Sequence, residues 1–177
     1  MLLLTCLTAR GFDFADTLPS GQVLYYSYVA GGVEVVHPNA NVSTGWVGYT
    51  KPIGSLTIPA RVSHDGTVYT VTAVGDYAFR YCTGLTSVVL SDGIASVGNS
   101  AFYSCTGIVE LTLPASMTSL GNGAFSLLGS LSDVWITLSA RASNPNCIRS
   151  FSFSGMYTIC WDTSFIKYIL LCFGRFI

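Results

Sequence analysis

The residues of this chain that could do chemistry are two histidines, six cysteines and nine acidic residues. His64 directly precedes Asp65, a pair that could act as a base and its orienting acid beside a serine. Both belong to a predicted hairpin turn, where adjacent residues rarely face each other, and His37 precedes Pro38 in a predicted loop. The sequence contains no motif of a phosphate loop, a zinc site or a nucleophile elbow. We therefore predict no catalytic residue, no metal site and no cofactor, and a protein that is not an enzyme.

Two of the cysteines occupy one position of an internal repeat. Cys82 and Cys105 lie 23 residues apart, and Leu128 fills the place a further 23 residues on. A site that also accepts leucine is apolar and buried, and free cysteine behaves there as a small hydrophobe. Neighbouring coils lie about 4.7–4.9 Å apart, which would also permit a disulfide. We expect buried thiols, and a Cys82–Cys105 bond is the alternative.

The repeat that places these cysteines occurs in three copies, at residues 74–90, 97–113 and 120–136, each beginning 23 residues after the last. A fixed period of about 20–50 residues indicates stacked coils. The apolar positions that recur form the predicted repeat core: Val74, Phe79, Cys82, Leu85, Val97, Phe102, Cys105, Ile108, Leu120, Phe125, Leu128 and Leu131.

Each copy is predicted to hold a short strand and a short helix. The strands end the copies, as in 88–90 and 111–113, and the A-F-x-x-C segment (Ala101–Cys105) is predicted to form one or two helical turns. Phe79, Phe102 and Phe125 should stack as a continuous ladder. One repeat buries too little apolar surface to offset the entropy of ordering its residues, so stacking must cover both of its faces.

Side chains alternate across a strand, so the middle residues of the three strands should share one exposed face. The predicted binding residues on this face are Val89, Glu110, Thr112, Asp133 and Trp135. An exposed aromatic such as Trp135 can anchor a contact. The alternative interpretation is a scattered apolar residue of an ordinary surface.

These repeats resemble the BspA-type leucine-rich repeat family. The resemblance rests on V-G-x-x-A-F-x-x-C-x-G-L-x-x-V-x-L at 74–90, on its copy at 97–113, and on Pro114-Ala115-Ser116 after it. It covers residues 56 to 136 closely, with a weak echo onward to 155. The resemblance implies a right-handed solenoid of short strands and helices on bacterial surface or secreted proteins. Many such relatives are adhesins or extracellular binding proteins, and the repeats themselves are not enzymes.

The first part of the chain is predicted to be a leader and a cap. Residues 1–19 are interpreted as a remnant export signal and a linker, with an apolar strand as the alternative to the signal. Residues 20–73 are predicted to form a β-rich cap that covers the open end of the stack. It holds a hairpin over 22–36 and an inserted hairpin over 61–71 that turns at Asp65-Gly66. Leu56-Thr57-Ile58-Pro59 matches Leu111-Thr112-Leu113-Pro114, which predicts a further strand of the stack.

The last part of the chain departs from the repeat. The leucine-rich-repeat solenoid is predicted to span residues 74–157, with a degenerate fourth repeat at 148–155. Residues 158–177 form an apolar tail with no repeat spacing, interpreted as a truncated or out-of-frame end; a strand pair or a partner-facing patch is the alternative. Lys167 and Arg175 interrupt the tail, which is too short for the roughly 20 apolar residues of a membrane span.

The predicted fold class is an α+β repeat solenoid, a leucine-rich-repeat-like stack of 23-residue coils with an N-terminal β-rich cap. The net charge of −1 and the lack of a basic run exclude a nucleic-acid groove. We predict a non-catalytic extracellular binding or adhesion module, secreted or on the cell surface, that recognises a protein or glycan through the repeat sheet face. A structural spacer, or a truncated fragment of a larger surface protein, is the alternative. No oligomeric state is predicted.

Overall fold

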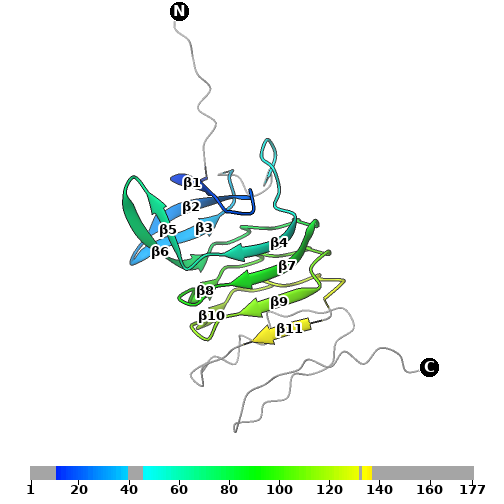
Figure 1. The fold of residues 1–177 in the computed structure, drawn as a ribbon. Coiled ribbons are helices and arrows are strands. Elements are labelled where there is room, and N and C mark those ends of the chain that lie inside the picture. Colours follow the sequence, from blue (N-terminus) through cyan, green and yellow to red (C-terminus); the bar gives the residue numbers. More distant parts are fainter. Residues whose placement is uncertain (1–10, 40–45, 132, 137–177) are drawn as a thin grey trace, which may run out of the picture.

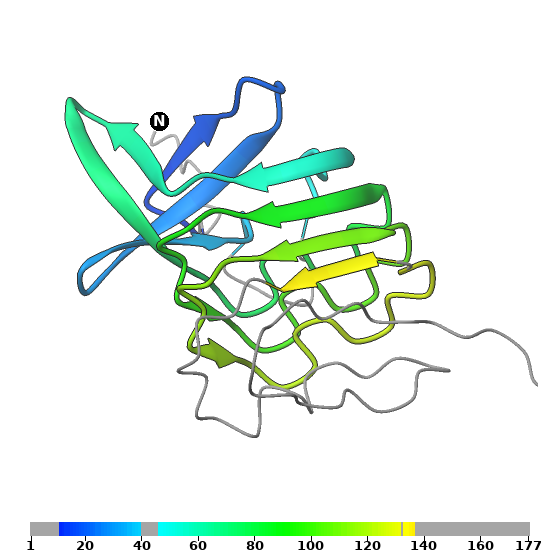
Figure 2. The same cartoon turned by 60° about the horizontal axis from the view of Figure 1, so that its bottom comes forward.

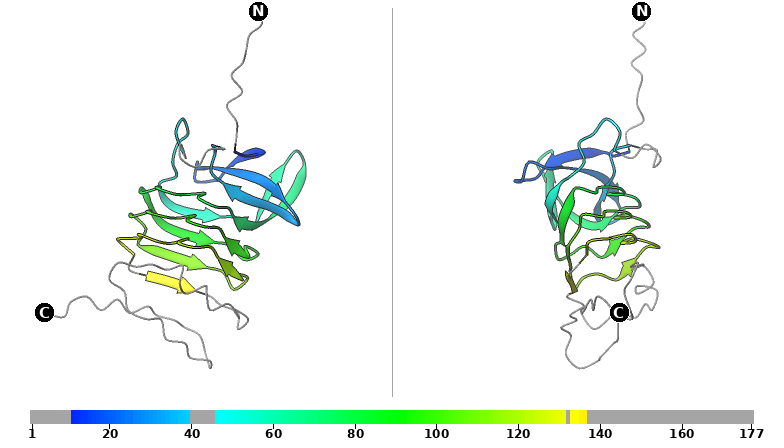
Figure 3. Two further views of the ribbon diagram at one scale, coloured as in Figure 1. Left: turned by 180° about the vertical axis from the view of Figure 1, so that it is seen from behind. Right: turned by 90° about the vertical axis from the view of Figure 1, so that its right-hand side faces the viewer.

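The computed structural model describes residues 11–39, 46–131 and 133–136. These residues form strands and turns, and Figure 1 shows the strands in two groups, a cap at the N-terminal end and a stack beneath it. The two further views in Figure 3 place the cap over the same end of the stack. No helix among the described residues has the length and apolar character that a membrane crossing needs.

The cap begins with three antiparallel strands. They are β1 (Phe14–Thr17), β2 (Val23–Val29) and β3 (Gly32–Val36). Val29 lies opposite Gly32, which confirms the first predicted hairpin. β1 lies where the sequence predicts a linker. Phe14 is buried opposite Tyr26 of β2, and this burial stabilises the short segment as an edge strand.

The second predicted hairpin is also confirmed. Strands β5 (Arg61–His64) and β6 (Thr67–Val74) pair antiparallel, with His64 opposite Thr67. Asp65 and Gly66 between them have φ values of 47° and 75°, the left-handed pair that a two-residue hairpin needs. β6 continues past the hairpin and pairs in parallel with β3, so it joins the cap to the stack.

The stack has a parallel sheet on each of two sides. One sheet has the order β11-β9-β7-β4, from β4 (Gly54–Ile58), β7 (Leu85–Leu90), β9 (Glu110–Leu113) and β11 (Asp133–Ile136). On the other side, β6 is followed by β8 (Ser96–Val97) and β10 (Ser119–Leu120). Figure 2 shows the four longer strands side by side. The pairing of β4 with β7 confirms the further strand predicted from the Leu56–Pro59 match.

The short helix predicted at Ala101–Cys105 does not form. The N–H groups of Phe102 and Ser104 donate to the carbonyls of Ala124 and Ser126 in the next coil, at 2.8 and 2.9 Å. The N–H of Tyr103, which lies between them, donates to the carbonyl of Ser100 at 3.1 Å, and the N–H of Cys105 donates to the carbonyl of Phe102 at 3.3 Å, so both close tight turns. An α-helix would direct every N–H to the carbonyl four residues back. In this segment every second N–H donates to a carbonyl of the neighbouring coil instead.

Backbone geometry explains why a helix cannot continue through this segment. Ser100 and Ser104 have φ values of 51° and 59°, in the left-handed region. The equivalent residues of the other copies agree, with values of 59° to 63° at Tyr77, Tyr81, Gly123 and Leu127. A right-handed helix excludes such residues. The apolar spacing of A-F-x-x-C fits a helical turn equally well, and that is why the sequence pattern misleads here.

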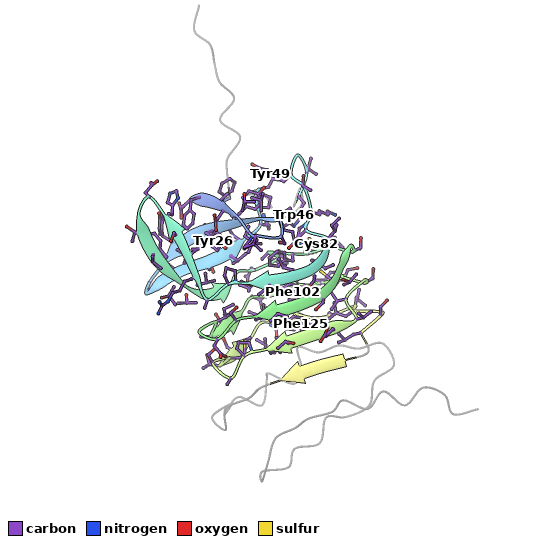
Figure 4. The ribbon with its side chains drawn as sticks, viewed as in Figure 1. Tyr26, Trp46, Tyr49, Cys82, Phe102 and Phe125 are labelled. Carbon is purple, nitrogen blue, oxygen red and sulfur yellow. The ribbon has the colours of Figure 1, made fainter. Side chains whose placement is uncertain are left out.

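The core of the stack is organised around a ladder of rings. Phe102 stacks on Phe79 and Phe125, with ring centroids 5.0 and 5.2 Å apart and planes within 15° and 8°. At the capped end, Trp46 stacks on Phe79 at 6.2 Å. Figure 4 shows Trp46, Phe102 and Phe125 one below another. Eleven of the twelve predicted core residues are buried, and Leu120 is partly buried against them.

The cysteines of the repeat are free thiols inside this core, as predicted, and no bond joins Cys82 to Cys105. The Cys105 thiol donates to the carbonyl of Phe79 at 3.0 Å. Burial raises the pKa of the Cys82 thiol well above its ordinary value, and burial raises the pKa of Cys105 to about 12. Both thiols therefore stay protonated at neutral pH and act as apolar packing groups.

Candidate binding face

The four-stranded parallel sheet of the stack, β11-β9-β7-β4, presents its side chains in registered rows. Ser87 of β7 lies beside Glu110 of β9, and Glu110 lies beside Asp133 of β11. In the same way Val89 lies beside Thr112, and Thr112 beside Trp135. Neighbouring strands lie about 4.7–4.9 Å apart, so each row places one residue of every coil at that spacing. We call these the acidic row and the central row.

Strand β4 extends both rows by one residue. Ser55 pairs with Ser87, and Thr57 pairs with Val89. Ser55 and Thr57 are both exposed, whereas Leu56, which lies between them, is fully buried. Sequence reasoning missed Ser55 and Thr57 as members of the face. The match of Leu56–Pro59 to Leu111–Pro114 was the signal, because it sets Thr57 in the place of Thr112.

The structure brings three of the five predicted binding residues together. Val89 and Thr112 are half-buried neighbours, and Glu110 is exposed beside them. Val88 and Leu111, beneath this face, are fully buried, so the alternation expected of these strands holds. The backbones of Asp133 and Trp135 lie in β11, while their side chains lie outside the described part of the structure.

The chemistry of this face is that of hydroxyl groups and one carboxylate. The Ser87 hydroxyl donates to Glu110 Oε2 of the next coil at 3.5 Å. Within the described side chains of the rows, Glu110 is the sole charged group, among serine, threonine and valine. The face can accept and donate hydrogen bonds along these two registered rows. The described residues hold no group of three metal-binding side chains.

The two histidines differ from the expectation of ordinary turn and loop residues. His64 Nε2 lies 3.4 Å from Asp65 Oδ2, so the two neighbours do face each other. The imidazole also stacks on the ring of Phe14 at 4.2 Å, which fixes it against the cap. His37 is buried, and this burial lowers its pKa. Sequence patterns could not place either histidine, because the stacking of His64 on Phe14 and the burial of His37 both depend on the tertiary fold.

Comparison with known proteins gives a family match over most of the repeat region. The model of the BspA type leucine rich repeat region matches residues 66–168 in six copies. This range is more than half of the chain and includes all three sequence copies identified above. A search of curated proteins found no match.

One solved structure shows the same type of fold. A leucine rich cell surface protein from Faecalibacterium prausnitzii A2-165 is 23% identical, with a TM-score of 0.50 over 70% of this chain and 30% of that protein. A leucine-rich repeat protein from Bacteroides capillosus ATCC 29799 is 21% identical, with a TM-score of 0.44, over 70% and 99% of the two chains. The pneumococcal vaccine antigen PcpA is 19% identical, with a TM-score of 0.41, over 75% and 39%. The chain thus spans about a third of the Faecalibacterium protein.

Proposed function

Because the chain belongs to the BspA-type leucine-rich repeat family, we propose that it is a non-catalytic binding or adhesion module of a secreted or cell-surface protein. Leucine-rich repeat proteins generally bind other proteins, and repeats of this family are generally not enzymes. The module recognises a protein or a glycan through the acidic and central rows. In this proposal the described part of the solenoid comprises β4 and residues 74–131 and 133–136, while residues 11–39 and the β5–β6 hairpin cap it. The predicted continuation of the solenoid to residue 157 lies outside the described residues.

The observation that carries this proposal is the register of the two rows. Glu110, Thr112 and their partners on β4, β7 and β11 repeat at the spacing of neighbouring strands. Every coil therefore adds one side chain to each row, and the result is an extended face that suits a large ligand. The name of the Faecalibacterium prausnitzii relative, a cell surface protein, supports the same location here.

Location is tested by protease shaving of intact producing cells, with the released peptides identified by mass spectrometry. We expect peptides from residues 85–113 among those released from the cell surface. Recovery of the chain only after cell lysis would rule out the surface location. A cytoplasmic protein that is absent from the shaved fraction and appears after lysis shows that the cells stayed intact during shaving.

Binding is tested with the purified chain on a panel of extracellular proteins and glycans. Any ligand found is then titrated against the Glu110→Ala and Trp135→Ala variants. The matched control is Thr106→Ala, since Thr106 is exposed on a turn away from the sheet. Weaker binding by the sheet variants alone, with unchanged melting temperatures, is the expected result. Equal binding by all three variants, or no ligand at all, favours the structural spacer instead.

A further inference from the structure

The cap contains a second surface with a chemistry unlike that of the repeat sheet. Its strands follow the order β1-β2-β3-β6, and β5 pairs with the other side of β6. This sheet curls so that its outer strands, β1 and β5, come into contact without pairing through their backbones. The rings of Phe14 and His64 bridge the two strands, with planes within 9°.

Five rings gather at this junction, and we call them the cap aromatic cluster: Phe14, Tyr26, Tyr28, His64 and Tyr69. The Phe14 ring lies at the centre, 5.1 Å from Tyr26 and 5.5 Å from Tyr28. Tyr28 and Tyr69 contact each other at 5.2 Å, edge to face. Figure 4 shows where Tyr26 lies within the cap.

The cluster runs from the interior to the solvent. Phe14 and Tyr26 are buried, His64 and Tyr69 are half-buried, and Tyr28 is 48% exposed. An outward tyrosine whose ring is held by its neighbours offers a rigid aromatic surface at little entropic cost, as binding sites do.

Two carboxylates flank the exposed end of the cluster. Asp13 Oδ2 accepts the backbone N–H of Tyr28 at 2.7 Å, which fixes that carboxylate beside the backbone of this tyrosine. Asp65, whose side chain is 89% exposed, follows His64 at the tip of the β5–β6 hairpin. A hydrogen bond with Tyr69 raises the pKa of the Tyr28 phenol, and the negative charges of Asp13 and Asp65 act in the same direction. Both carboxylates therefore act electrostatically on the same ring.

The positive side chains of the described residues lie elsewhere. Lys51 Nζ donates to the carbonyl of Tyr81 at 3.1 Å, and Arg80 Nη2 donates to the Tyr81 hydroxyl at 3.0 Å. Arg61 is on β5, but strand alternation directs it to the face opposite His64. The exposed end of the cluster is thus aromatic and acidic, which is the combination that attracts a cation to a ring face.

We propose that the cap aromatic cluster binds a lysine or arginine side chain of a partner protein, with the cation over the rings of Tyr28 and Tyr69 and close to the carboxylates of Asp13 and Asp65. This surface is separate from the acidic and central rows. The proposal holds whether or not the repeat sheet binds a ligand.

The test is a calorimetric titration of the full chain with hexalysine and hexaarginine peptides, with hexaglutamate as the negative probe. We expect Tyr28→Ala to weaken the binding of the cationic peptides about fivefold. The double variant Asp13→Asn with Asp65→Asn should weaken it about tenfold and reduce its salt dependence. The matched control is Tyr81→Ala, which removes a tyrosine that is 45% exposed beside Lys51 and Arg80. This control should bind within twofold of the parent chain.

Three outcomes would overturn the proposal. The first is no binding of either cationic peptide by the folded parent chain. The second is binding that Tyr28→Ala and Tyr81→Ala weaken equally, which indicates diffuse attraction to the surface. The third is Tyr28-dependent binding of neutral oligosaccharides without binding of the peptides, which assigns the cluster to glycans. Melting temperatures of all variants establish that each is folded, and Tyr28→Phe keeps the ring if Tyr28→Ala proves unstable.

Discussion

The carboxylate of Asp76 accepts the backbone N–H of Asn99, one coil further along the stack, at 2.6 Å. The side-chain oxygen of Asn99 in turn accepts the backbone N–H of Asn122 at 2.8 Å. Gly98 and Gly121 precede these asparagines, and a Cβ on either would collide with the backbone of the preceding coil. At the Gly-Asn pair of each copy, successive coils therefore approach each other closely and are joined by side chains.

Loss of this link should be measurable. Asn99→Ala removes the acceptor for the Asn122 N–H, and we expect the free energy of unfolding to fall by about 1–2 kcal/mol. The measurement is urea denaturation followed by circular dichroism. Thr106→Ala, at an exposed turn position of the same coil, should change stability by less than about 0.5 kcal/mol. Equal stability of the two variants would show that the link contributes nothing.

The ring ladder should dominate the stability of the stack. Phe102 is fully buried between Phe79 and Phe125, and Phe102→Ala leaves a cavity between two rings. We expect a loss of about 3–5 kcal/mol in the free energy of unfolding. Phe102→Leu, which keeps most of the apolar volume, should lose clearly less. A loss under 1 kcal/mol for Phe102→Ala would contradict the ladder as the central packing element.

The left-handed turn positions predict a contrast between two glycines. Gly123 has a φ of 63°, and its equivalents in the first two coils are also left-handed. Gly123→Ala should therefore destabilise the protein by about 1–2 kcal/mol. Gly129 has no such backbone conformation and has open space around it, so Gly129→Ala should be neutral or slightly stabilising. Thermal denaturation compares the two, and a reversed order of melting temperatures would refute the turn assignment.

The buried thiols predict a loss of stability in alkali. Burial raises the pKa of Cys82 and of Cys105 in the folded protein, whereas unfolded thiols lose their protons near a pKa of about 8.5. Above that pH the unfolded state holds fewer protons, so stability falls as the pH rises, by up to about 1.4 kcal/mol per pH unit for each thiol.

Urea denaturation at a series of pH values from neutral to alkaline measures this slope. The double variant Cys82→Ala with Cys105→Ala should show a shallower decline than the parent chain, even if packing loss makes it less stable throughout. Alkylation followed by peptide mass spectrometry provides a second readout. Both cysteines should resist iodoacetamide in the native protein and react in denaturant, and rapid reaction of the native thiols would contradict their burial.

The period of the sequence was enough to predict how the coils stack. Residues 23 apart, such as Cys82 and Cys105, lie in neighbouring coils because a constant step leaves one register for the parallel strands. The rows that contain Val89 and Thr112 follow from that register and from strand alternation. The hairpin at Asp65-Gly66 was predictable for a local reason, since its turn requires two left-handed residues.

What escaped prediction depends on partners distant in the sequence. The segment Ala101–Cys105 has the spacing of a helical turn. It forms turns instead of a helix because its amides donate to the carbonyls of Ala124 and Ser126 in the next coil. Likewise, the cap aromatic cluster exists because β1 and β5 meet, so that Phe14 stacks on His64. No sequence periodicity within either segment predicts these contacts.

The alternate amides that each coil shares with the next also determine how this protein responds to force. The strands lie across the stack while the hydrogen bonds between coils run along it. A load applied through the two ends of the stack therefore opens these bonds one coil at a time and does not shear them all together. Each coil of 23 residues released in this way adds about 80 Å of extended chain. A stack loaded in this way would lengthen in even steps, and each step would dissipate energy.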